Sequence, residues 1–127
     1  MAKYDIIQET YSNDPWKVLI CCILLNQTNN KQVRPLIEEF FLKWPDPFSV
    51  SLERKESISD FIKSTGFQNV KAQRILGLSN EWMKGNRDLG NLPGVGEYAR
   101  ETWRIFIDND VNFTPKDKKL KMYIDSL

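Results

Sequence analysis

Residues 91–106 read NLPGVGEYARETWRIF, and this stretch decides the fold that we expect for the rest of the chain. Pro93 cannot continue an incoming helix, while Gly94 and Gly96 permit positive φ values and a close approach of the backbone to a ligand. A new helix follows directly, with apolar residues at helical spacing at Ala99, Trp103 and Phe106. The free backbone N–H groups at its start form an anion site, and a phosphate is the obvious guest.

Three interpretations of this turn are open. Residues 94–99 match a dinucleotide-binding pattern, but that pattern needs a preceding strand, and residues 86–93 are polar and include a glycine and a proline. A second interpretation is a purely structural corner between two helices. The third is a helix-hairpin-helix element, in which a nucleic-acid phosphate is held by Leu92, Pro93, Gly94, Val95 and Gly96.

The composition is that of an ordinary soluble globular protein, with 127 residues and a formal net charge of +1. We expect one domain over residues 1–127. The apolar residues 18–25 are too few to span a bilayer, the N-terminus does not read as a secretory signal, and no membrane contact is expected. Cys21 and Cys22 are adjacent and read as small core residues in a reduced compartment. The lack of histidine and of a C-x-x-C pair excludes histidine catalysis and the usual zinc sites.

Helix signals recur along the whole chain, and no alternating strand pattern exceeds a few residues. Asp14 and Pro15 begin a helix that is apolar nearly all round, which predicts a buried central helix. A capping box at Ser57 predicts a helix that closes at Gly66 in a left-handed conformation. The expected helices are residues 4–11, 16–25, 32–42, 57–66, 69–84, 97–107 and one from Thr114 to the end. We therefore predict an all-α fold.

Asp117 is the residue that we expect to carry chemistry. Its structural interpretation is a capping-box carboxylate on a helix begun by Thr114. The functional interpretation rests on its place about twenty residues after the hairpin. It also rests on the lysines around it, Lys116, Lys118, Lys119 and Lys121. A carboxylate at a helix N-terminus stays ionised, so it can stabilise a cationic transition state or orient a water as general base.

A family resemblance joins these features. Residues 92–96 with Ala99 closely resemble the hairpin of the helix-hairpin-helix DNA glycosylase superfamily. Further segments resemble, in order, the glycosylase domain of methyl-CpG-binding mismatch-specific thymine/uracil DNA glycosylases: residues 8–10, 14–17, 25–28, Gly66, Lys71 with Ala72, Tyr98, residues 103–106 and residues 115–120. The resemblance implies a compact two-lobed helical fold. No four-cysteine loop follows Asp117, so it implies neither an iron–sulfur cluster nor any other cofactor.

The same resemblance implies a DNA glycosylase of base excision repair. Asp117 stands where the superfamily has its essential aspartate. Tyr98 stands where members that also cleave the DNA strand carry a lysine that attacks the sugar, so the resemblance implies a monofunctional enzyme that uses water. The implied substrate is thymine or uracil mispaired with guanine in duplex DNA, flipped out of the helix for hydrolysis of its N-glycosidic bond.

Residue roles follow from the resemblance. Gln8, Tyr98 and Lys119 would form the base pocket, and the hairpin at residues 92–96 would bind a DNA phosphate. Gln27 and Phe67 would enter the DNA on either side of the flipped base. Both depart from the usual pattern, because the subfamily can carry arginine at the first position and leucine is commoner at the second.

Two other functions remain open: a non-catalytic module that binds distorted duplex DNA, with Asp117 only as a cap, and a glycosylase for another damaged base. From the resemblance we further expect a monomer in the nucleus. The resemblance also implies that the chain is part of a longer protein.

Overall fold

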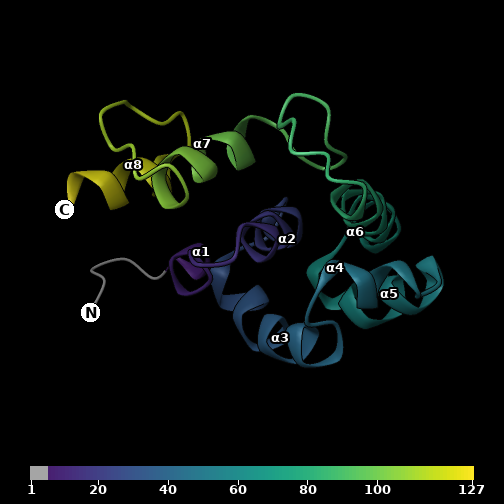
Figure 1. The fold of residues 1–127 in the computed structure, drawn as a ribbon. Helices are drawn as coiled ribbons and strands as arrows, with labels where there is room; N and C mark the ends of the chain where they lie inside the picture. Colours follow the sequence, from purple (N-terminus) through teal and green to yellow (C-terminus); the bar gives the residue numbers. More distant parts are fainter. Residues whose placement is uncertain (1–5) are drawn as a thin grey trace.

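The computed structural model describes residues 6–127, and over this range every regular element is helical, as predicted (Figure 1). The elements are α1 (Ile7–Thr10), α2 (Pro15–Leu25), α3 (Asn30–Lys43), α4 (Pro47–Ser51), α5 (Lys55–Ile62), η1 (Lys63–Thr65), α6 (Gln68–Met83), α7 (Glu97–Phe106) and α8 (Lys118–Asp125). Residues 4 and 5 of the first expected helix lie outside the described residues. Within the described range, no helix is long and apolar enough to cross a membrane.

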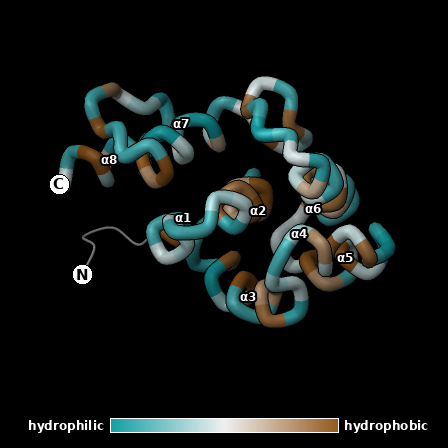
Figure 2. Tube along the Cα trace, viewed as in Figure 1, coloured by the Kyte–Doolittle hydropathy of each residue, from teal (hydrophilic) through white to brown (hydrophobic). Residues whose placement is uncertain are grey.

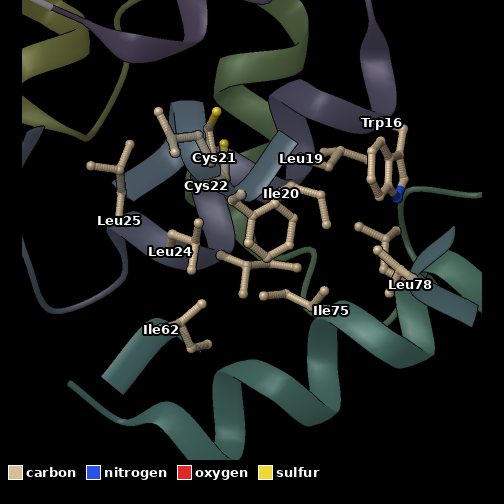
Figure 3. Close-up of a cluster of buried hydrophobic side chains, with 14 of the residues drawn as sticks. Trp16, Leu19, Ile20, Cys21, Cys22, Leu24, Leu25, Ile62, Ile75 and Leu78 are labelled. Carbon is tan, nitrogen blue, oxygen red and sulfur yellow. The ribbon is translucent and has the colours of Figure 1, made fainter. Parts of the chain in front are cut away.

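Helix α2 is the centre of the molecule, as its sequence predicts. All of its residues from 18 to 25 are buried, and α1, α3, α6 and α7 pack around it (Figures 1 and 2). Asp14 begins the helix as expected, since its Oδ1 accepts a hydrogen bond from Lys17 N at 3.2 Å. In Figure 3, Ile62, Ile75 and Leu78 reach towards α2 from the helices below it. Each fully buried aliphatic side chain contributes roughly 1.5–3 kcal/mol, so α2 forms a rigid frame for its neighbours.

The apolar side chains form two clusters, which correspond to the two lobes. The larger cluster surrounds α2 and includes Leu92 from the hairpin and Ala99 from the start of α7. The smaller cluster joins the end of α7 to α8 through Ile6, Ile105, Phe106, Leu120 and Tyr123. Helix α7 therefore bridges the lobes, and its position fixes α8 relative to α2.

The region between α3 and α6 differs from the prediction in two places. Asp46 caps the unexpected short helix α4, where Oδ1 accepts from Ser49 N at 2.8 Å and the Ser49 hydroxyl accepts from Asp46 N. Helix α5 begins at Lys55, after the extended residue Arg54, so Ser57 lies inside the helix instead of capping it. A capping-box pattern is local, and here the helix starts before it.

The helical segment closes at Gly66 with a positive φ of 78°, as predicted, but its ψ of 161° lies outside the left-handed helical region, and the residue in that region is Phe67 at φ 49° and ψ 38°. The start of the last helix was predicted wrongly. The last helix begins at Lys118 and not after Thr114, with Asp117 itself as the N-cap. Asp117 thus directly precedes the first residue of α8 and does not lie one turn inside the helix.

Candidate functional site

The glycine-rich hairpin at residues 92–96 is held tightly against α2 and α6. Leu92 lies in the main core, and its carbonyl accepts a hydrogen bond from Val95 N at 3.2 Å. Gly94 has a φ of 76°, and a Cβ atom there would lie only 2.8 Å from Ile23 Cδ1. Among the described residues, no side chain caps α7 after Gly96, so the N–H groups of its first turn are available to an anion.

Two neighbouring cavities share Asn26 and Tyr98 in their walls. One, of about 400 Å³, is bounded by the hairpin and the start of α7. The other, of about 580 Å³, lies between the turn after α2 and the start of α8, and its walls include Gln27, Asp117 and Lys119. Gln27, Tyr98, Asp117 and Lys119 come from three distant parts of the sequence, and the structure brings them to this second cavity, beside the hairpin.

Asp117 is fixed at the start of α8 by contacts on both sides of its backbone. Its Oδ2 accepts a hydrogen bond from Leu120 N at 2.9 Å. Glu101 of α7 accepts the preceding backbone N–H groups: Oε2 from Lys116 N at 2.8 Å and Oε1 from Asp117 N at 3.3 Å. The partial positive charge of the helix start lies beside the Asp117 side chain. This arrangement can present a fixed negative charge to the cavity.

Gln8 lies behind Tyr98 and not in the cavity wall. Its side chain is fully buried, and Nε2 donates to the Tyr98 hydroxyl at 2.6 Å. Its Oε1 is buried without a partner among the described residues. Gln8 therefore does not lie on a solvated helix face. Burial is the main cause that raises the pKa of Tyr98 well above its usual value, so this phenol stays protonated at neutral pH.

Cys22 completes the polar cluster around Gln8, since its Sγ lies 3.9 Å from Gln8 Nε2. Burial raises the pKa of the Cys22 thiol to about 12, and the thiol is therefore protonated and unreactive at neutral pH. Both cysteines are free and buried. They are core residues, as the sequence predicted.

Gln27 and Phe67 share an unusual backbone conformation. Each has a positive φ, 59° for Gln27 and 49° for Phe67, although neither is a glycine. Both side chains are exposed, and 62% of Phe67 is accessible to solvent. Strained backbone and an exposed aromatic ring each carry a free-energy cost that packing does not repay, and such residues concentrate at functional sites.

The four lysines around Asp117 have different environments. Lys119 borders the cavity, as does Lys118. Lys116 instead pairs with Glu97 at 3.1 Å, and Lys121 pairs with Asp125 along α8 at 2.9 Å. Only the first two are therefore placed to act on a molecule in the cavity.

The sequence analysis assigned no role to two residues whose hydrogen bonds support the site and its neighbouring loops, Glu101 and Lys71. Glu101 lies four residues after Glu97 on α7, and in sequence this spacing reads as a solvated charged face. Lys71 is fully buried near the start of α6. The sequence of α6 does not reveal this burial, because the groups that accept hydrogen bonds from Lys71 Nζ belong to α2 and η1.

Comparison with known proteins places the chain in a family. A model of the "HhH-GPD superfamily base excision DNA repair protein" matches residues 20–123, from within α2 to within α8. The chain belongs to this superfamily. The family resemblance and the helical fold predicted from the sequence are thereby confirmed. In this superfamily member, the described residues contain no group of three or more side chains arranged to hold a metal ion.

Individual relatives agree with the family match. The methyl-CpG-binding domain protein 4-like protein of Arabidopsis thaliana is 33% identical over 125 residues, which are 97% of this chain and 28% of that protein. A thymine/uracil-DNA glycosylase of Pyrobaculum aerophilum is 35% identical over 96 residues, 69% of this chain and 42% of that protein. The solved structure of a thermostable thymine-DNA glycosylase has the same fold, with a TM-score of 0.73 at 24% identity over 85% of this chain and 53% of that chain. This HhH-GPD chain spans less than half the length of the two sequence relatives.

Proposed function

We propose that this protein is a monofunctional DNA glycosylase that removes thymine or uracil mispaired with guanine from duplex DNA. The observation that carries the proposal is the cavity of about 580 Å³ in which Gln27, Tyr98, Asp117 and Lys119 meet. Its volume falls within the range of about 300–1,000 Å³ that is usual for small-molecule pockets. Relatives whose names specify thymine and uracil as substrates support the same choice of base.

The hairpin and the two exposed loops supply the DNA contacts in this proposal. A backbone phosphate binds the N–H groups at the hairpin and the start of α7. Gln27 and Phe67 enter the duplex and occupy the space that the extruded nucleotide vacates. A mispaired base costs less to extrude than a paired one, and this difference supplies part of the selectivity for mismatches.

Asp117 carries the chemistry. As the bond between the base and C1′ of the sugar breaks, the electron pair leaves with the base and positive charge develops on the sugar. The ionised Asp117 stabilises this charge and accepts a proton from the water that adds to C1′. Tyr98 has no amine, so this position cannot form a Schiff base with the sugar, and the product is an abasic site in an intact strand.

Gln8 supplies base recognition from behind Tyr98. Thymine and uracil present an N–H donor next to carbonyl acceptors, and the Gln8 amide offers one acceptor and one donor that match them. Its Oε1 has no partner within residues 6–127, while Nε2 donates to the Tyr98 hydroxyl. In this proposal the base reaches the amide when the Tyr98 ring shifts aside.

The test is a single-turnover assay with labelled duplexes that carry G:T, G:U, A:8-oxoguanine or an alkylated adenine. The proposal predicts alkali-labile abasic sites in G:T and G:U alone, with intact strands before alkali. Borohydride would trap any Schiff base between the sugar and a lysine at the cavity, Lys118 or Lys119, as a covalent complex. The proposal predicts that no such complex forms. Cleavage of only the other duplexes refutes the choice of base, and binding of G:T without any product identifies a non-catalytic binding module.

The proposed partner is double-stranded DNA with a G:T or G:U mismatch, bound by one copy of the chain. As a base excision repair protein, the chain acts where DNA is held. A nuclear location is proposed on the resemblance to the methyl-CpG-binding glycosylases.

A further inference from the structure

Lys71 is a charged side chain that the proposed mechanism does not use. It is fully buried near the start of α6. Its Nζ donates to Leu24 O at 2.8 Å, to Thr65 O at 2.9 Å and to Thr65 Oγ1 at 3.4 Å. Burial lowers the pKa of Lys71 to about 8, so at neutral pH the ammonium is still largely protonated and can donate three hydrogen bonds.

The acceptors of Lys71 lie at the ends of the two helical segments that lead into the loops proposed to enter DNA. Leu24 lies near the end of α2, three residues before Gln27, and Thr65 lies two residues before Phe67. The main-chain N–H of Lys71 also donates to Phe67 O at 3.0 Å. Lys71 is thus hydrogen-bonded to the segments next to both Gln27 and Phe67, the two residues with positive φ.

We propose that Lys71 is a positioning residue that couples the Gln27 and Phe67 loops during base extrusion. The inference rests on the proposed function. Both side chains must enter one duplex at a fixed spacing, and the ammonium sets that spacing by joining the carbonyl groups of Leu24 and Thr65. Lys71 does not border the cavity that contains Asp117, so its effect falls on extrusion and not on cleavage of the N-glycosidic bond.

The experiment compares two uracil substrates at saturating enzyme. One duplex carries uracil opposite guanine, and the other carries uracil opposite a stable abasic-site analogue, where no pair has to be broken. Lys71→Met should slow single-turnover cleavage of the first by at least about tenfold and of the second by less than about threefold, after correction for active enzyme. Lys71→Arg should restore much of the loss, since arginine keeps the charge and several donors.

Lys55→Met is the matched control, because it removes the same charge from an exposed position on α5 and should alter neither rate. An equal loss on both substrates with Lys71→Met overturns the proposal and makes Lys71 a purely structural residue. Wild-type protein that cleaves neither substrate refutes the proposed function instead.

A second measurement does not depend on the folding of Lys71→Met. In the wild-type background, Gln27→Ala and Phe67→Ala should show coupled effects on extrusion, measured by the fluorescence of 2-aminopurine next to the mismatch. The double variant should then lose less than the product of the two single losses. Independent, multiplicative losses would mean that the two loops act separately and would overturn the proposed coupling.

Discussion

Gly94→Ala tests whether the hairpin geometry is essential to the protein. The substituted residue would have to adopt a φ of 76°, which costs an alanine roughly 1–2 kcal/mol. Its Cβ would also lie 2.8 Å from Ile23 Cδ1 and 3.1 Å from Arg74 Cβ, and overpacking of this kind costs about 1–3 kcal/mol. Together these costs amount to about 2–5 kcal/mol, because rotation of the Ile23 Cδ1 end leaves the tight contact with Arg74 Cβ and the unfavourable φ in place.

Gly96→Ala provides a matched control within the same turn. Its φ is −105°, and a Cβ there would meet no atom within 4 Å. We expect Gly94→Ala to lower the midpoint of thermal unfolding by roughly 6–15 °C, and Gly96→Ala to change it little.

The matching assay measures the affinity of each variant for a duplex with a stable abasic-site analogue. Because the hairpin is the proposed phosphate site, Gly94→Ala should weaken binding at least about tenfold even at temperatures where it is folded. A Gly94→Ala protein with wild-type stability and affinity would show that the hairpin does not depend on the backbone conformation of residue 94. Equal losses for both glycine variants would show that side-chain bulk facing DNA matters, and not the backbone conformation of residue 94.

Three further predictions concern the contacts around the cavity. Glu101→Gln leaves one backbone N–H of the Asp117 segment facing an NH₂ group, so the single-turnover cleavage rate should fall about fivefold. Glu97→Gln breaks only an exposed pair with Lys116 and should change the same rate less than about twofold. Tyr98→Phe removes the acceptor of Gln8 Nε2 and should lower the free energy of unfolding by about 1–3 kcal/mol in denaturant titrations, whereas an unchanged midpoint would mean that Gln8 finds another partner. Burial and the hydrogen bond to Glu9 raise the pKa of Tyr123 to about 12, so its stabilising contribution is complete below pH 10 and is lost between about pH 10 and 12. The free energy of unfolding of the wild type should therefore fall with pH across this range, and Tyr123→Phe should lack this part of the fall.

Local sequence signals were sufficient for the hairpin and the central helix. The turn needs glycine at residue 94 because its φ is positive, and α2 is apolar nearly all round, so neither feature depends on distant contacts. The start of α8 was predicted wrongly because Thr114 and Pro115 make a good local start signal. In the fold, Glu101 accepts the N–H groups of Lys116 and Asp117, and the helix begins only after them.

The candidate site was predictable only as far as the family resemblance reached. It named the residues that meet at the cavity, but not the burial of Gln8 behind Tyr98. Lys71 and Glu101 were missed for a physical reason. A lysine or glutamate in a helix normally lies in water, and their acceptors and donors here come from segments 6 to 47 residues away, which no local pattern reveals.

The catalytic role of Asp117 is best tested by the single-turnover cleavage rate of Asp117→Asn on a G:T duplex, measured beside the wild type. Asparagine caps a helix as well as aspartate does, so the hydrogen bond to Leu120 N and the fold are kept while the charge is removed. The account predicts a rate at least about a hundredfold lower with DNA affinity retained. A variant that releases thymine as fast as the wild type would contradict it and would leave Asp117 as a helix cap alone.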